Sequence, residues 1–354
     1  MSSLAVPLLV LVFVCCAGVI WFAGIQLSNT TDVLDDRLHL GSALGGVVLL
    51  AIATNLPEIA ITVTAAASGD IGVAIGNILG GIALQTVVLV ALDAFGGKRR
   101  APLTYQAASL SLVLEAGLVI AVLTVAVMGS QLPSTLHVGR VAPASVLIAV
   151  LWLVGVVLLS KARGRLPWQE SGEAPDNQVP PQGHAKQQKN QQAAAKKIST
   201  ARAAAVFSVA ALATLAAGFF LEQSGEALAD HIGLTGVLFG ATVLAAATSL
   251  PELSTGITSV RLGDTQLAMS DIFGGNAFLP VLFLVATLIS GRPALPQAQD
   301  TDIYLTGLGI LLTVVYVFGL LFRPRRTIAR MGPDSLTVLL LYAAGIAGLV
   351  AIAR

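Results

Sequence analysis

Apolar residues run in long stretches along most of the chain, and polar residues gather in shorter segments between them. Several stretches reach about 20 residues without Lys or Arg, the length that an α-helix needs to cross a bilayer. The pattern predicts an all-α membrane protein with ten transmembrane helices. Their expected spans are 4–25, 41–67, 71–92, 105–129, 143–160, 203–221, 235–260, 265–290, 303–322 and 335–353.

One long polar segment divides the chain. Residues 161–202 are rich in Gln, Pro and Lys. Such a composition cannot bury an apolar core, so we expect a largely disordered linker. The predicted organisation is a five-helix unit over 1–160, the linker over 161–202, and a second five-helix unit over 203–354.

The two units share a sequence repeat. Residues 41–86 align with 235–280 without a gap, and 17 of the 46 positions are identical. Each unit has an odd number of helices, so the second unit is expected to enter the membrane from the opposite side. Inverted repeats with interrupted helices are the architecture of secondary transporters, whose binding site lies near the middle of the membrane.

Composition and charge placement agree with this interpretation. The chain is 55% hydrophobic and 11% charged, whereas about 25% of residues are charged in soluble domains. Of the 20 Lys and Arg residues, 17 fall in the segments that follow expected helices 1, 3, 5, 7 and 9. The positive-inside rule places these segments, including the linker, in the cytoplasm and both termini outside the cell membrane. Nothing in this distribution indicates a nucleic-acid partner.

A hexapeptide with a proline and a glutamate occurs once in each unit, inside an apolar stretch. Residues 53–58 read ATNLPE and residues 247–252 read ATSLPE. Proline has no backbone N–H and clashes with the carbonyl four residues earlier, so helices 2 and 7 are expected to break near Pro57 and Pro251. The carbonyls of Ala53 and Ala247 then lose their helical partners and need a polar cavity or a cation.

The other polar residues of the hexapeptides are spaced to share one helix face with the glutamate. A charge in the middle of a membrane costs about 2.5–3.5 kcal/mol on insertion scales, and two-fold symmetry would bring the two glutamates together. Calcium takes about 6–8 oxygen ligands, and the two motifs offer carboxylate, hydroxyl, amide and carbonyl oxygens. One copy alone would fit a kink with a satisfied glutamate, but two copies in register favour a cation site. The candidate ligands are Glu58 and Glu252 as metal ligands, with Thr54, Asn55, Thr248, Ser249, Ala53 and Ala247.

The segments ATNLPE…GDIGVAIGNILGGIALQT and ATSLPE…GDTQLAMSDIFGGNAFLP resemble the two alpha repeats of the cation/calcium exchanger superfamily, which includes the sodium/calcium exchangers. The resemblance implies antiport by alternating access, with Glu58 and Glu252 as the principal cation ligands. Thr54, Thr248 and Ser249 also match the family pattern, whereas Asn55 replaces its usual serine. No cofactor is implied, and Ca²⁺, Na⁺ or H⁺ would be the transported substrates.

The glycine-rich segments depart from the family pattern G-N-x-x-G-S-N-x-x-N. The first copy keeps Asn77 but has Gly81 for the serine, Ile82 for an asparagine and Gln85 for the last asparagine. The second copy has Gly275 for the serine, keeps Asn276, and has Leu279 where exchangers carry Asn or Asp. Asn77, Gln85 and Asn276 stay candidate ligands, but the family's sodium coupling ratio is not expected to carry over directly.

Two further acids lie in expected helices. Asp271 stands where the family has asparagine, and on a helix it shares a stripe with positions 275 and 279. It could be a ligand, a helix-start residue or the partner of a hydroxyl. Glu115 in the fourth expected helix aligns with Gly309, and it could tune the site or make a structural hydrogen bond. Lys, Arg and His are absent from the expected spans, so the charges of the four acids need a cation or a proton.

The sequence thus predicts a secondary-active antiporter that moves calcium or a related cation in exchange for sodium or protons. One alternative is a ten-helix carrier of an organic substrate, of the drug/metabolite type, which also has five-plus-five inverted repeats. A second is an intramembrane enzyme, such as an aspartyl protease that uses two acids, although protease motifs are absent. The expected partners are inorganic cations and the lipid bilayer, and the oligomeric state stays open.

Overall fold

The computed structural model describes residues 4–38, 52, 54–95, 101–136, 141–164, 199–233, 239–263 and 265–352. Within these residues the regular secondary structure is helical, apart from an isolated bridge between Ile328 and Met331. Eight helices in the described ranges are long and apolar enough to cross a membrane. The all-α membrane architecture expected from the sequence is therefore confirmed at this level.

The helices of the first half match the apolar stretches of the sequence. Their bounds are α1 (Val6–Leu38), α3 (Leu56–Ser68), α4 (Ile71–Phe95), α5 (Leu103–Ala107), α6 (Leu110–Ser130) and α7 (Pro143–Gly164). The fourth stretch was expected to form one helix over 105–129. It is instead divided at Ala108 and Ser109, whose backbones leave the helical conformation. The Ser109 side chain caps α6 by accepting from the Leu112 N–H.

The second half contains more short elements. Its bounds are α9 (Thr200–Ile232), η2 (Gly240–Leu244), α11 (Ala245–Thr248), α12 (Leu250–Leu262), α13 (Thr265–Phe278), η3 (Leu279–Val281), α14 (Leu282–Ser290), η4 (Leu295–Gln297), α15 (Asp300–Phe322) and α16 (Pro333–Ile352). The expected span 265–290 is confirmed as an apolar stretch of helix from Thr265 to Ser290. A 3₁₀ turn divides it at Pro280, because a proline cannot donate to the helical carbonyl four residues earlier.

The two halves repeat helix boundaries as well as sequence. The bounds of α9 lie 194 residues after those of α1, and the same offset relates α12 to α3. Both α3 and α12 end at a glycine in the left-handed conformation, Gly69 with φ 90° and Gly263 with φ 89°. Only glycine adopts this conformation without strain, so the same C-terminal stop is encoded twice.

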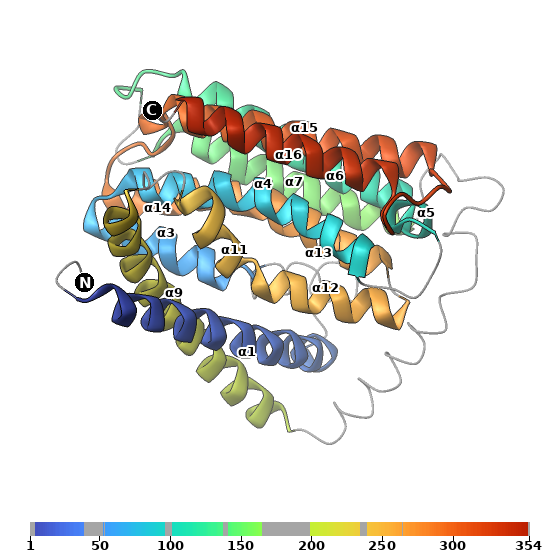
Figure 1. Ribbon diagram of the computed structural model, residues 1–354, viewed down its shortest axis with the longest axis horizontal. Coiled ribbons are helices and arrows are strands. Elements are labelled where there is room, and N and C mark those ends of the chain that lie inside the picture. Colours follow the sequence, from blue (N-terminus) through green and yellow to red (C-terminus); the bar gives the residue numbers. More distant parts are fainter. Residues whose placement is uncertain are drawn as a thin grey trace.

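Helices α4 and α13–α14 form the centre of the bundle. The apolar window is 72% buried in α4 and 67% buried over α13–α14, against 22% in α1. Around this centre, α15 packs on α4, α6 packs on α13, and α16 and α7 cover the outside of α15 and α6. On the opposite face α1 and α9 lie side by side across α3 and α12 (Figure 1). The two motif-bearing helices are thus enclosed between the centre and the α1–α9 pair.

The interruption expected near Pro251 is confirmed. α11 ends at Thr248, Ser249 leaves the helical conformation with φ −82° and ψ 6°, and α12 starts at Leu250. In the first copy Asn55 has nearly the same angles, φ −87° and ψ 15°, and α3 starts at Leu56. Residues 39–51 and Ala53 lie outside the described residues, as does most of the linker over 161–202, so the break expected in helix 2 stays a prediction on its N-terminal side.

Candidate cation-binding site

The two motif glutamates occupy equivalent places at the starts of two helices. Glu58 lies in the first turn of α3 and Glu252 in the first turn of α12. The first turn of a helix presents N–H groups without helical partners and the positive end of the helix dipole, which favours a carboxylate. Both side chains are buried, with exposed fractions of 0% and 1%. The sequence therefore places two acids in the interior at sites that backbone dipoles partly support.

Close glycine contacts hold these helix starts in place. Gly24 of α1 lies against Pro251, where an added Cβ atom would come within 2.7 Å of the proline Cβ. Gly218 of α9 lies against the first copy, where an added Cβ would come within 3.0 Å of Ala60 Cβ and 3.4 Å of the Pro57 carbonyl oxygen. Gly24 and Gly218 are 194 residues apart, so the repeat extends to the outer helix pair.

Amides from α4 surround the first motif. The Gln85 Nε2 group donates to Glu58 Oε1 at 3.3 Å and to Asn55 Oδ1 at 3.2 Å. The Asn77 Nδ2 group donates to the Glu58 backbone carbonyl at 3.4 Å. Gln85 and Asn77 thus both donate to Glu58, and Gln85 also links Glu58 to Asn55.

Contacts between the two repeats close the cluster. The Thr248 side chain of the second motif lies beside the Glu58 carboxylate of the first, with its hydroxyl donating to the Ala245 carbonyl oxygen at 3.1 Å. Glu252 is close enough to Glu58 for their charges to interact. Between the central helices, Asn276 Nδ2 donates to Thr86 Oγ1 at 3.1 Å. The structure therefore brings together side chains that lie up to about two hundred residues apart in the chain, as the two-fold repeat predicted.

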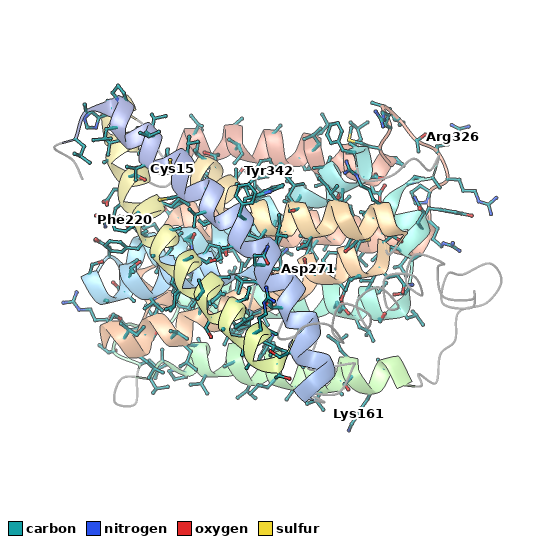
Figure 2. The ribbon with its side chains drawn as sticks, turned by 90° about the horizontal axis from the view of Figure 1, so that it is seen from below. Cys15, Lys161, Phe220, Asp271, Arg326 and Tyr342 are labelled. Atoms are coloured by element: carbon teal, nitrogen blue, oxygen red, sulfur yellow. The ribbon has the colours of Figure 1, made fainter. Side chains whose placement is uncertain are left out.

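Asp271 of α13 is buried next to the second motif. Its Oδ2 atom accepts a hydrogen bond from the Thr255 hydroxyl at 3.0 Å, and its charge interacts with that of Glu252. Figure 2 shows Asp271 near mid-length of the bundle, between the end that carries Cys15 and Phe220 and the end that carries Lys161 and Arg326. Of the three roles raised for Asp271, the structure shows the hydroxyl partner, Thr255, and a ligand role stays a prediction.

The described part of the cluster contains an unusual number of buried oxygen atoms to which no protein group donates a hydrogen bond. Hydrogen bonding normally satisfies such atoms, and oxygens are the ligands that hard cations select. Among the described residues no three acidic, His or Cys side chains form a metal-ligand group, so neutral oxygens would have to complete a cation's shell. The seven atoms are Glu58 Oε2, Gln85 Oε1, Ser249 Oγ, both carboxylate oxygens of Glu252, Asp271 Oδ1 and Asn276 Oδ1.

The remaining candidates have less direct relations to the cluster. Thr54 is buried near the start of the first motif, and Ala247 is buried in α11. Ala53 lies outside the described residues. Glu115 is buried in α6, which packs against α13, so it lies on a helix adjacent to the one that carries Asp271.

The sequence interpretation did not single out two hydroxyl residues that contact candidate residues. Thr86 follows Gln85 in α4 and accepts from Asn276. Thr255 lies three residues after Glu252 in α12 and donates to Asp271. The spacing of Thr255 from Glu252 puts both on one face of a helix, which was an available signal. The sequence carried no comparable signal for Thr86, because its partner comes from the other repeat.

Comparison with a curated protein gives a relative of similar length. The chain is 26% identical over 288 residues to the inner membrane protein YrbG of Escherichia coli (strain K12), covering 78% of this chain and 77% of that protein. The alignment spans most of both proteins.

Solved structures of exchangers share the fold. The chain matches the crystal structure of the H⁺/Ca²⁺ exchanger CAX with a TM-score of 0.69 and 14% identity, over 97% of this chain and 85% of that one. It matches the sodium-calcium exchanger NCX_Mj with a TM-score of 0.60 and 15% identity, over 97% and 99% of the two chains. At these identities the likeness concerns the fold.

A family model decides the assignment. The model described as sodium/calcium exchanger protein matches residues 8–164 and 202–350, which is most of the chain on both sides of the polar segment. This family consists of cation antiporters embedded in membranes. Membership in it rules out the alternative of an intramembrane enzyme that uses two acids. In the structure each half of the chain contributes one motif glutamate, Glu58 from α3 and Glu252 from α12. The chain belongs to the sodium/calcium exchanger protein family.

Proposed function

We propose that this cation antiporter moves calcium, or a divalent cation of similar chemistry, in exchange for sodium or protons. The cation would be held between α3 and α12 by Glu58 and Glu252. Two carboxylates balance the charge of one divalent cation, and no fixed positive side chain is required between them. The organic-carrier alternative offers no reason for paired buried acids, whereas a cation site needs them.

The observation that supports this proposal best is the set of buried oxygens without protein donors. They come from α3, α4, α12 and α13 and from the turn at Ser249. Leaving a buried acceptor unpaired costs about 1–3 kcal/mol, so seven such atoms in one cluster would be a heavy penalty without a ligand. A calcium ion prefers about 6–8 oxygens, which this set and the neighbouring backbone carbonyls could provide.

We further infer a transport architecture of ten helices in two inverted repeats, over 1–160 and 203–354, with the linker 161–202 between them. The equivalent pairs α1 with α9 and α3 with α12 support this. So do the equivalent packing pairs, since α1 packs on α12 as α9 packs on α3. Because the two repeats are equivalent and inverted, movement of one repeat against the other can open the site first to one side of the membrane and then to the other.

We propose that the protein lies in the cell membrane with its basic end in the cytoplasm and both termini outside. Lys161 and Arg326 lie toward the same end of the bundle in Figure 2. α1 begins and α16 ends at the opposite end (Figure 1). Basic residues near helix ends favour the cytoplasmic side, and the linker would then also be cytoplasmic.

Calcium flux into proteoliposomes tests the proposal. Purified protein is reconstituted with an outward gradient of either sodium or protons, and radioactive calcium uptake is measured. The proposal expects uptake that depends on one of these gradients and disappears in Glu58→Gln. Asp300→Asn, which alters an exposed acid in the first turn of α15, is the matched control. Gradient-independent uptake, or equal uptake in Glu58→Gln and in the control, would contradict it.

A further inference from the structure

A second pair of acids lies outside the site described above. Asp93 is near the C-terminal end of α4, and Asp334 is the second residue of α16. The segment that joins α15 to α16 contains Arg323, Arg325, Arg326 and Arg330, and Figure 2 shows Arg326 at one end of the bundle. The pair is therefore at the basic end, whereas the motif glutamates lie in the interior.

Asp93 connects three parts of the chain. Its Oδ1 atom accepts from the Leu103 N–H and its Oδ2 atom accepts from the Gly332 N–H, each at 2.7 Å. The Ser335 side chain also hydrogen-bonds with it. These donors fix the Asp93 carboxylate in place.

Asp334 is buried beside it without such support. It is 7% exposed, and neither of its carboxylate oxygens receives a hydrogen bond from the protein. The carboxylate lies between Gly319 of α15 and Gly332, where an added Cβ atom at either glycine would collide with it. Small residues thus make room for a buried acid whose oxygens have no donor.

The two acids and two hydroxyls form one oxygen-rich group. Asp334 and Asp93 interact electrostatically with each other and with Tyr316, which is fully buried in α15. The Tyr316 and Ser335 hydroxyls are 3.4 Å apart. The group therefore offers two carboxylates and two hydroxyls from α4, α15 and α16.

Two basic side chains of the segment between α15 and α16 contact Tyr105. Arg323 donates to the Tyr105 carbonyl oxygen at 3.2 Å and lies 4.6 Å from the centre of the Tyr105 ring. Arg325 lies 5.5 Å from the same ring. Neither supplies a hydrogen bond to Asp334, because both of its oxygens are without donors.

We propose that Asp93 and Asp334, with the hydroxyls of Tyr316 and Ser335, form a second divalent-cation site that is separate from the transport site. Two carboxylates and neutral oxygens suit a hard divalent cation such as Ca²⁺. A cation there would join the ends of α4, α15 and α16, and so stabilise the scaffold around the transport site. In the proposed orientation this site faces the cytoplasm, and only that placement depends on the proposed function.

Calcium-dependent stability in a transport-site variant tests this inference. The double variant Glu58→Gln/Glu252→Gln removes both principal acids of the transport site, and its unfolding temperature is followed during a CaCl₂ titration in detergent. Binding to the folded state alone raises the unfolding temperature with ligand concentration. We expect a rise in the double variant and no rise once Asp334→Asn is added. Asp302→Asn is the matched control, because Asp302 is a buried acid at the other end of α15 that caps the helix.

A second measurement keeps the test decisive if Asp334→Asn folds poorly. Tb³⁺ replaces Ca²⁺, and luminescence sensitised by Tyr316 is recorded in the same double variant. We expect a luminescence signal that Ca²⁺ displaces. Tyr316→Phe should weaken this signal, and Gly319→Ala should weaken it by displacing the Asp334 carboxylate.

A double variant without calcium stabilisation or displaceable luminescence would overturn the inference, as would calcium stabilisation that persists in Asp334→Asn. Stabilisation by acid that calcium does not reproduce would also overturn it in favour of a shared proton. None of these outcomes depends on calcium flux, so failure of the proposed transport activity would be seen separately.

Discussion

Gly81 of α4 lies opposite Leu279 of η3, since a Cβ atom placed on Gly81 would come 4.0 Å from Leu279 Cδ1. These are two positions at which the chain departs from the exchanger pattern, one in each repeat. The departures therefore meet in space and replace a hydroxyl and an acid or amide by an apolar contact. Gly275 differs, because a Cβ atom there would come within 2.8 Å of Asn55 Nδ2, so the larger Asn55 uses the space that this glycine leaves.

The Gly81–Leu279 contact predicts how sodium dependence could be increased. Gly81→Ser with Leu279→Asp restores a hydroxyl and a carboxylate at adjacent positions, and the space beside Gly81 admits a side chain. We expect the double variant to show stronger sodium dependence of calcium flux than the parent. The measurement is flux against external sodium, with Leu279→Asn alone as the control. Unchanged sodium dependence in the double variant would show that these positions do not contribute a sodium site.

Removal of the motif carboxylates is expected to abolish divalent binding without unfolding the protein. Glu58→Gln and Glu252→Gln keep side-chain size, and Gln85 can still contact a glutamine at position 58. Each change removes half of the negative charge that balances the cation. Calorimetric calcium binding, measured together with gel-filtration profiles, checks this prediction. Wild-type affinity in either monodisperse variant would remove that glutamate from the site.

The accessory acids are expected to tune the site. Asp271→Asn makes the second repeat resemble the first, where Asn77 is the equivalent residue, and it removes a charge that interacts with Glu252. We expect a change in calcium affinity or coupling ratio with transport retained, and a smaller change of the same kind for Glu115→Gln. The readouts are affinity and the ratio of coupled fluxes. If neither quantity changes in either variant, both acids have structural roles.

Close packing of the outer helices predicts a contrast between two glycines of α1. Gly24→Ala would place a Cβ within 2.7 Å of Pro251, a rigid residue directly before Glu252. Gly18→Ala meets no atom within 4 Å. Overpacking of this kind typically costs about 1–3 kcal/mol, so we expect Gly24→Ala to lower the unfolding temperature and slow transport. Gly18→Ala should match the parent in both measurements, and equal behaviour of the two variants would contradict the packing argument.

Much of the fold and site could be predicted because one signal was repeated. The apolar stretches marked the helices, and the duplicated hexapeptide identified Glu58 and Glu252, which the structure places at equivalent helix starts. The resemblance to exchangers added the glycine-rich segments, which offered Asn77 and Gln85 as candidate ligands, and in the structure both residues donate to Glu58.

Other features could not be predicted because they depend on tertiary contacts. The sequence does not signal the division of the fourth apolar stretch at Ala108 and Ser109. Neither alanine nor serine breaks a helix as proline or glycine does. The contact of Thr86 with Asn276 joins residues of different repeats and has no local spacing signal. The Asp93–Asp334 pair was missed because the two acids are at helix ends, where a charged residue is ordinary, and only folding brings them together.

Protons are expected to compete with the transported cation at the motif glutamates. Glu58 and Glu252 interact electrostatically, and like charges in a water-poor site are stabilised only when a cation or protons neutralise them. The two carboxylates should therefore bind and release protons as a coupled pair. Calcium must displace any bound proton, so its apparent affinity should fall as the pH falls, by up to about tenfold per pH unit for each proton displaced. Calcium binding measured over a pH series around neutrality checks this.

A proton gradient imposed on calcium-loaded vesicles without sodium should also drive calcium movement, and Glu58→Gln should abolish it. Strict sodium dependence together with pH-independent affinity would rule out the proton as competitor and as counter-ion.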